Sequence, residues 1–132
     1  MSTQFINNWD LVDSSAPQIV GGWLFERKRA PLYKLVKSRS LWERRIALLA
    51  TFYFIRKNDF NDTLGLSELL LEDDEDLIHK ATGWMLREAG KRDIDVLTGF
   101  LDRHSETMPR TMLRYALEKL PDKQRKRYMA KA

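Results

Sequence analysis

Cysteine is absent from the 132-residue chain, which excludes disulfide bonds, thiol catalysis and thiolate metal sites. Glycine and proline are scarce, with 6 and 4 residues, so the composition does little to interrupt long helices. No apolar run approaches the roughly 20 residues that cross a bilayer. The N-terminal residues also lack the basic and long apolar blocks of a signal peptide. We therefore expect a cytoplasmic protein with no membrane partner.

The rest of the composition is that of one folded domain spanning residues 1–132. Hydrophobic residues make up 43% of the chain and charged residues 32%, which is typical of globular rather than disordered proteins. The formal net charge of +4 moderately favours an acidic partner, and nucleic acid is one such partner.

The most apolar segment, residues 40–55, is expected to form a central helix. Ser40 followed by Glu43 makes a capping box, in which each side chain satisfies a backbone N–H of the first turn. Residues 46–55 are apolar on nearly every side of such a helix, so neighbouring helices should cover it.

Two arginines, Arg44 and Arg45, stand near the start of this helix. The helix dipole places partial positive charge there and disfavours a cation by roughly 0.3–1 kcal/mol. Two explanations fit the residues alone. Either an anion such as phosphate binds at the helix start beside the guanidinium groups, or both arginines pair with Glu or Asp on an adjacent helix.

Helical spacing of apolar residues continues along the chain, and no segment alternates with period two for long enough to form a strand. We predict a loop at residues 58–62 and a turn in the acidic run 72–76, which also supplies the first turn of the next helix. Asp93, Pro109 and Asp122 are predicted to begin helices. The other predicted helices cover residues 3–12, 15–29, 31–36, 64–71 and 77–89. The fold class is therefore all-α.

The predicted helices also show a weak internal repeat. Helices that start basic and turn apolar, near Arg45, Lys80 and Arg110, recur at about 30 to 36 residues, each after a shorter helix. Antiparallel helix pairs stacked at this period are typical of a HEAT-like solenoid. Because a solenoid presents the same end of each helix along one concave face, we expect Arg44, Arg45, Lys80 and Arg110 to line one groove suited to a polyanion.

Three segments carry a resemblance to a known family: residues 9–17 (WDLVDSSAP), 41–47 (LWERRIA) and 78–88 (IHKATGWMLRE). In these segments, and in their order and spacing, the chain resembles the DNA alkylation repair glycosylases built from HEAT-like repeats, the AlkD family. The likeness covers nearly the whole chain. It implies that the chain corresponds to the C-terminal half or more of the family fold and lacks roughly the N-terminal half, whose repeats help to grip the duplex.

The resemblance also implies a function. Trp9, Asp13, Arg45 and Trp84 fall on the positions at which the family holds a damaged nucleotide in double-stranded DNA. The family hydrolyses the N-glycosidic bond of purines alkylated on a ring nitrogen, such as 3-methyladenine and 7-methylguanine, without flipping the base into a pocket. Arg44, Lys80 and Arg110 would join Arg45 in contacting the DNA backbone. No cofactor and no metal are expected.

These residue types suit that chemistry. A ring-alkylated purine is already cationic and leaves without a general acid, so a catalyst needs to stabilise the positive charge that develops on the sugar. Asp13 can supply a negative charge and orient a water molecule. Trp9 and Trp84 can offer electron-rich faces to the cation, and Arg45 can hold a neighbouring phosphate.

Each assignment has a structural alternative. Both tryptophans can be core residues, and Asp13 can cap the helix that restarts at Ser15. The chain can accordingly be a DNA-binding relative without catalysis, or a helical-repeat module that binds protein. Because the first helix lacks a preceding repeat, we also expect self-association through the N-terminal edge.

Overall fold

The computed structural model describes residues 29–131, and this part of the chain contains seven helices and no strand. The all-α prediction is confirmed there, whereas the helices predicted before residue 29 lie outside the described residues. In chain order the helices are α3 (Ala30–Leu35), α4 (Leu41–Arg56), α5 (Asn61–Leu69), α6 (Asp76–Arg92), α7 (Ile94–His104), α8 (Arg110–Leu117) and α9 (Asp122–Lys131). None of these helices is long and apolar enough to span a membrane.

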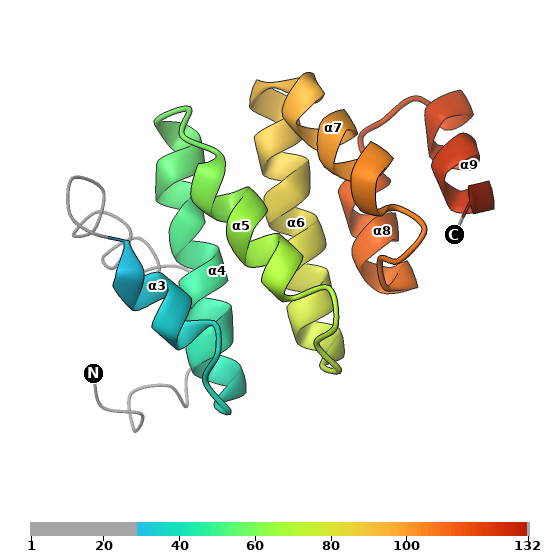
Figure 1. The fold of residues 1–132 in the computed structure, drawn as a ribbon. Helices are drawn as coiled ribbons and strands as arrows, with labels where there is room; N and C mark the ends of the chain where they lie inside the picture. Colours follow the sequence, from blue (N-terminus) through green and yellow to red (C-terminus); the bar gives the residue numbers. More distant parts are fainter. Residues whose placement is uncertain (1–28, 132) are drawn as a thin grey trace.

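The helices form two layers with α9 at one end (Figure 1). Helices α4, α6 and α8 run in the same direction in one layer, which we call the inner layer. Helices α3, α5 and α7 run the opposite way across them and form the outer layer. The inner helices begin at Leu41, Asp76 and Arg110, a spacing of about 35 residues that agrees with the predicted repeat. The helical-repeat architecture expected from the sequence is thus present.

Helix α4 has the central position predicted for it. The backbone N–H of Glu43 donates to Ser40 Oγ (3.4 Å), so Ser40 caps the helix as expected. The side chains buried along α4 are Ile46, Ala47, Leu48, Leu49, Ala50, Thr51, Phe54 and Ile55. Thr51 satisfies its buried hydroxyl by donating to the Leu48 carbonyl (2.6 Å). Such a helix is stable only with neighbours on several sides, and α3, α5 and α6 all contact it.

The helices begin where the sequence predicts, with one exception. Asp93 caps α7, because its Oδ1 accepts the backbone N–H of Asp95 (3.1 Å), and the acidic run ends in the first turn of α6 as expected. Helix α5, however, begins at Asn61 rather than Leu64. Asp59 Oδ1 accepts the backbone N–H of Asn61 (3.4 Å), so two residues predicted to lie in a loop form the first turn.

Helix α6 joins two clusters of buried side chains. Ile78, Ala81 and Met85 pack in the cluster around α4, and Leu86 packs in the cluster formed with α7 and α8. Gly83 allows α8 to approach closely, because a Cβ atom there would lie 2.5 Å from the Met112 carbonyl oxygen and 2.5 Å from Tyr115 Cβ. The inner layer is therefore held together through α6.

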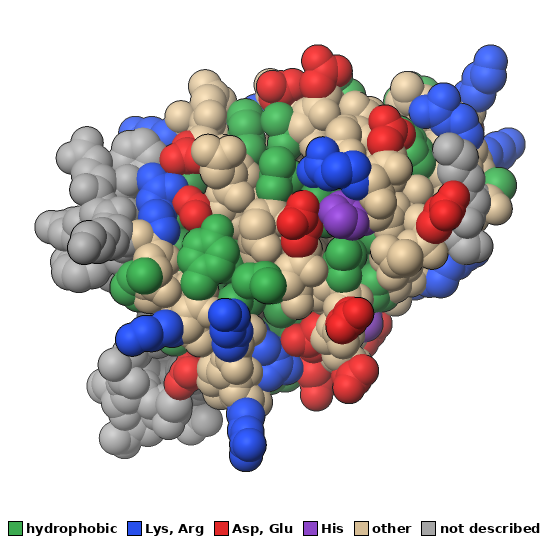
Figure 2. Space-filling view, viewed as in Figure 1, with side chains coloured by type: hydrophobic (Ala, Val, Ile, Leu, Met, Phe, Trp, Pro, Cys, Tyr) green, Lys and Arg blue, Asp and Glu red, His purple; other side chains and the backbone are tan. Residues whose placement is uncertain are grey.

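The outer layer presents a face of mixed charge. Figure 2 shows basic and acidic side chains interspersed with apolar ones over this face. One contact on it joins His104 Nε2 and Glu68 Oε1 at 3.3 Å, and Arg103 lies 3.9 Å from the same oxygen. A surface that favours a polyanion has to be sought in the inner layer instead.

Candidate nucleic-acid interface

A hollow of about 250 Å³ lies between the three inner helices, and we call it the cleft. Its lining residues are Arg45 from α4, Leu77, Lys80, Ala81, Trp84 and Arg87 from α6, and Tyr115 from α8. Three of these side chains are basic and none is acidic. The cleft therefore combines positive charge with two aromatic rings, which is a composition suited to nucleic acid.

Arg45 reaches across from α4 to α6. Its Nη1 donates to the backbone carbonyl of Leu77 (3.3 Å), and the side chain is half-buried. This contact crosses between two parallel helices near their N-terminal ends, where the dipole already favours an anion. Arg45 is thus held at the wall of the cleft in a place where a phosphate would be stabilised.

Trp84 lies at the boundary between the core and the cleft. Its Nε1 donates to Glu88 Oε1 (3.1 Å), and its ring is tilted by 51° against Phe52 with the centroids 6.2 Å apart. The residue is half-buried and packs against the core cluster around α4. The indole is therefore fixed by packing as well as lining the cleft, so the core and cleft interpretations of Trp84 both describe part of its environment.

The other two basic residues of the cleft are each paired with a carboxylate. Lys80 Nζ lies 3.3 Å from Asp76 Oδ2, and the pKa of Asp76 falls below its usual range because Lys80 donates a hydrogen bond to it. Arg87 forms an ion pair with Glu118 of α8. Asp76 is exposed, so its pair with Lys80 is of the weak surface kind that a phosphate can replace, whereas the Arg87 side chain is only 16% exposed in its pair with Glu118.

The comparison with protein families agrees with this geometry. A sequence model of the family described as "DNA alkylation repair enzyme" matches residues 2–120. The chain belongs to this DNA alkylation repair family. A role in DNA repair follows, with DNA as substrate or partner. No match was found among curated proteins or among solved structures.

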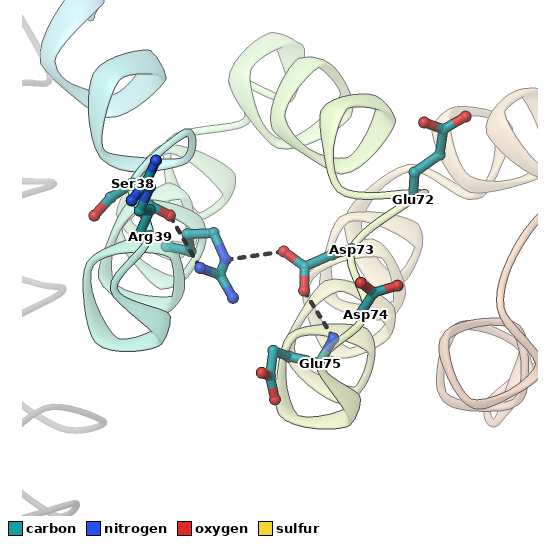
Figure 3. Close-up of a pocket in the computed structure, with 7 residues that line it drawn as sticks. Ser38, Arg39, Glu72, Asp73, Asp74 and Glu75 are labelled. Atoms are coloured by element: carbon teal, nitrogen blue, oxygen red, sulfur yellow. Dashed lines mark hydrogen bonds and ion pairs between the residues drawn. The ribbon is translucent and has the colours of Figure 1, made fainter.

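In this DNA alkylation repair protein the two neighbouring arginines of α4 have different surroundings. Arg44 Nε lies 2.9 Å from Asp73 Oδ2, and its Nη1 donates to the Ser38 carbonyl (2.9 Å). Arg44 lines a separate hollow of about 460 Å³, which we call the acidic hollow (Figure 3). The other residues that line it are Ser38, Arg39, Glu72, Asp73, Asp74 and Glu75. Of the two explanations left open by the sequence, pairing with an acidic residue holds for Arg44.

The remaining predicted residues do not line the cleft in the described part of the chain. Arg110 is exposed at the start of α8, where its Nη1 donates to the Met129 carbonyl (3.2 Å) of α9. Trp9 and Asp13 lie outside the described residues, as does the N-terminal edge predicted to self-associate. The structure thus brings together Arg45, Lys80 and Trp84, and it places Arg44 and Arg110 elsewhere.

Two residues of the cleft were missed by the sequence analysis. Arg87 follows Lys80 by two helical turns and Trp84 by one, so the spacing along α6 could have identified it. Tyr115 could not have been found in this way, because it reaches the cleft through the close approach of α8 to Gly83.

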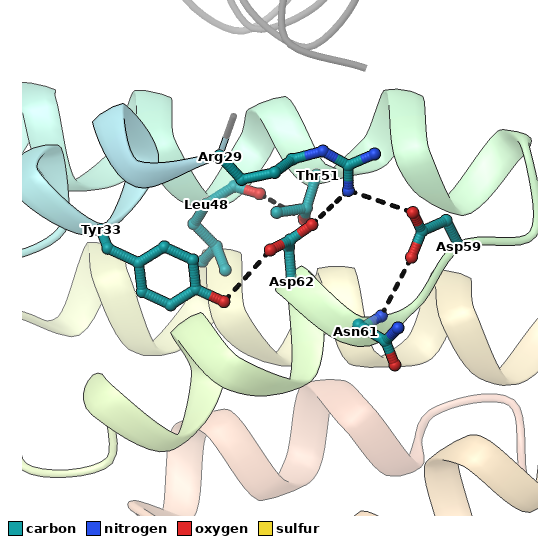
Figure 4. Close-up of polar contacts among 7 residues, drawn as sticks. All are labelled: Arg29, Tyr33, Leu48, Thr51, Asp59, Asn61 and Asp62. Atoms are coloured by element: carbon teal, nitrogen blue, oxygen red, sulfur yellow. Dashed lines mark hydrogen bonds and ion pairs between the residues drawn. The ribbon is translucent and has the colours of Figure 1, made fainter. Parts of the chain in front are cut away.

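A polar cluster in the outer part of the fold also escaped prediction (Figure 4). Arg29 forms ion pairs with Asp59 (3.0 Å) and Asp62, and the Tyr33 hydroxyl donates to Asp62 Oδ1 (3.1 Å). Burial, reinforced by the negative charge of Asp62, raises the pKa of Tyr33 to about 12. These contacts tie α3 and the residue before it to the start of α5, so the cluster stabilises the fold.

Proposed function

We propose that the protein binds duplex DNA along the cleft and hydrolyses the N-glycosidic bond of cationic N-alkylated purines, such as 3-methyladenine and 7-methylguanine, without base flipping. The observation that carries this proposal is the meeting of Arg45, Lys80 and Trp84 at one hollow whose lining, among the residues that the structure describes, includes no acidic side chain. Membership in a DNA alkylation repair family supports alkylated DNA as the substrate class.

The chemistry needs few groups. The alkylated base is already a cation, so it can leave without being protonated, and the barrier lies in the positive charge that develops on the sugar. An ionised Asp13 beside that sugar would stabilise it by on the order of 3 kcal/mol, which is about a hundredfold in rate. The faces of Trp84 and Trp9 would each add about 0.5–2 kcal/mol through cation–π contact.

The basic residues of the cleft would hold the strand that carries the lesion. Arg45 can bind a phosphate in two-pronged fashion, because a guanidinium presents a planar fork of donors. Lys80 would exchange its exposed partner, Asp76, for a phosphate, and Arg87 would add its positive charge while it stays paired with Glu118. Exposed pairs contribute only about 0.2–1 kcal/mol, so this exchange costs little.

The proposal is tested with a duplex that contains one 7-methylguanine, by measuring the base released over time. We expect release above the spontaneous rate, about a hundredfold less release by Asp13→Asn, and unchanged release by the control Asp95→Asn on α7. Trp84→Ala should also slow release, whereas Arg92→Ala, at the far end of α6, should not.

Two outcomes would reject the reaction. Release at the spontaneous rate by the wild-type protein is one, and equal release by wild type and Asp13→Asn is the other. If duplex binding nevertheless remained salt-sensitive and was weakened by Arg45→Ala, the chain would be a DNA-binding relative without catalysis.

A further inference from the structure

A third hollow, of about 380 Å³, lies between α8 and α9, and we call it the end groove. Its lining residues are Arg114, Leu117 and Glu118 from α8 and Arg125, Lys126 and Met129 from α9. The family match ends at residue 120, before α9 begins at Asp122. Half of the lining therefore belongs to a helix that the family likeness does not cover.

The end groove carries an excess of positive charge. Its one acidic residue, Glu118, is already paired with Arg87, and Arg125 is paired with Asp122. Arg114 and Lys126 are exposed and form no ion pair within the described residues. Two cations are thus available to an anion from outside the chain.

The apolar part of the end groove is small. Leu117 is buried and Met129 is half-buried, and these are the only two apolar side chains among its described lining residues. A partner helix would need a row of apolar contacts over several turns, which two side chains do not provide. A ligand with one flat apolar group and a negative charge fits the end groove better than a helix does, and an unpaired nucleotide is such a ligand.

The end groove is also connected to the cleft. Glu118 lines the end groove and pairs with Arg87, which lines the cleft. We propose that the end groove holds an unpaired nucleotide next to the bound duplex, with its base against Met129 and Leu117 and its phosphate at Arg114 and Lys126. This proposal rests on the duplex binding proposed above, and it predicts a preference for DNA at the junction of double and single strands.

The test compares three DNA probes with the same duplex core: one is blunt, one has a short single-stranded 3′ overhang, and one has a short single-stranded 5′ overhang. We expect the better of the two overhangs to bind about tenfold more tightly than the blunt probe in fluorescence anisotropy. Met129→Gln should abolish this gain and leave blunt binding unchanged, because it makes the groove polar at equal length and charge. Leu69→Gln, at an exposed apolar residue of α5, is the matched control and should keep the gain.

Salt dependence adds a second measurement. Arg114→Ala and Lys126→Ala should each lower the slope of log affinity against log salt by about 0.7 for the overhang probe, since each removes one contact to a single-stranded phosphate. Equal affinity for blunt and overhang probes, or a gain that survives Met129→Gln, would overturn the proposal. Binding of an acidic amphipathic Leu/Glu peptide that is lost in Met129→Gln and competes with the overhang would assign the groove to a protein partner instead.

The reaction is monitored separately on the blunt 7-methylguanine duplex. An overhang preference without base release rejects the proposed hydrolysis and retains the end groove as a nucleotide site. Base release without an overhang preference rejects the end groove alone.

Discussion

Arg44 and Arg45 are neighbours in the first turns of one helix, yet they belong to two different regions of the molecule. The acidic hollow surrounds Arg44 with four consecutive acidic residues, and the Arg44 and Asp73 side chains are only 13% and 10% exposed. The cleft presents Arg45 together with two further basic residues and, in the described part of the chain, no acidic one. The side chains of adjacent residues on a helix point about 100° apart, so Arg44 and Arg45 contact different neighbouring segments.

The difference shows that the role of a basic residue in the first turns of a helix depends on the segment packed against it. At Arg44 this segment is the turn before α6, whose carboxylates neutralise the guanidinium. At Arg45 it is the body of α6, which offers the backbone carbonyl of Leu77 at the wall of a cleft whose described lining includes two further basic side chains. The first arrangement stabilises the fold, and the second favours an external anion.

The largest effect is expected from removing the close approach that shapes the cleft. Gly83→Ala should lower the free energy of unfolding by about 3 kcal/mol, because the added Cβ would overlap the α8 backbone, which cannot move independently. Urea denaturation measures this change. The control is Gly99→Ala in α7, where the nearest atom is a side-chain nitrogen at 3.8 Å. That variant should be unchanged or more stable by up to about 1 kcal/mol.

The next largest effect separates the two arginines by stability. Arg44→Ala should lower the free energy of unfolding by about 2 kcal/mol, since it leaves the largely buried Asp73 without its partner. Asp74→Ala, on the same turn but exposed, should change stability by less than about 0.5 kcal/mol. A double-mutant cycle of Arg44 with Asp73 that gave no coupling would remove the distinction drawn here.

A third, smaller effect separates the arginines by DNA affinity. Arg45→Ala should weaken binding to duplex DNA about tenfold and reduce the salt slope by about 0.9, as expected for one lost phosphate contact. Anisotropy titrations at several salt concentrations provide both values. Arg92→Ala serves as the control for loss of a positive charge outside the cleft, and an equal loss in both variants would mean that Arg45 acts only through net charge.

The smallest effect concerns the polar cluster of Figure 4, in which Arg29, like Arg44, is paired with acidic residues. The pKa of Tyr33 is about 12 in the folded protein and about 10 when unfolded. The folded state therefore holds this proton more tightly, so the stability it contributes is complete below pH 10 and is lost as pH rises through 12.

Tyr33→Phe tests this dependence. The variant should lose less stability than the wild type between pH 10 and pH 12, as measured by urea denaturation at each pH. If the free energy of unfolding changed with pH in the same way for Tyr33→Phe and for the wild type, the pKa of Tyr33 would not be raised in the folded state.

Much of the fold was predictable because it depends on short-range patterns. The Ser40 cap, the acidic first turn of α6 and the spacing of the inner helices all follow from residues within a few positions of one another or from a repeated spacing. The start of α5 was missed because Asp59, two residues before the helix, accepts the backbone N–H of Asn61 inside a segment that resembles a loop.

The candidate site was predictable only in part. The presence of Arg45, Lys80 and Trp84 in one cleft followed from the repeat and the family likeness. The partner of Arg44 did not, because Asp73 lies 29 residues along the chain and several acidic residues of that turn were equally eligible. Tyr115 depends on how closely two helices pack, which a single sequence does not specify.

The regular rise of α6 would set the spacing of its contacts with DNA bound along the cleft as proposed. Lys80 and Arg87 are seven residues apart on one helix, so their backbones are separated by about 10 Å along its axis. Successive nucleotides of one strand advance by about 3.4 Å along B-form DNA. A DNA strand running alongside α6 would therefore contact these two cations at positions about three nucleotides apart, with the indole of Trp84 between them. The spacing along α6 would in this way determine which nucleotide lies opposite Trp84.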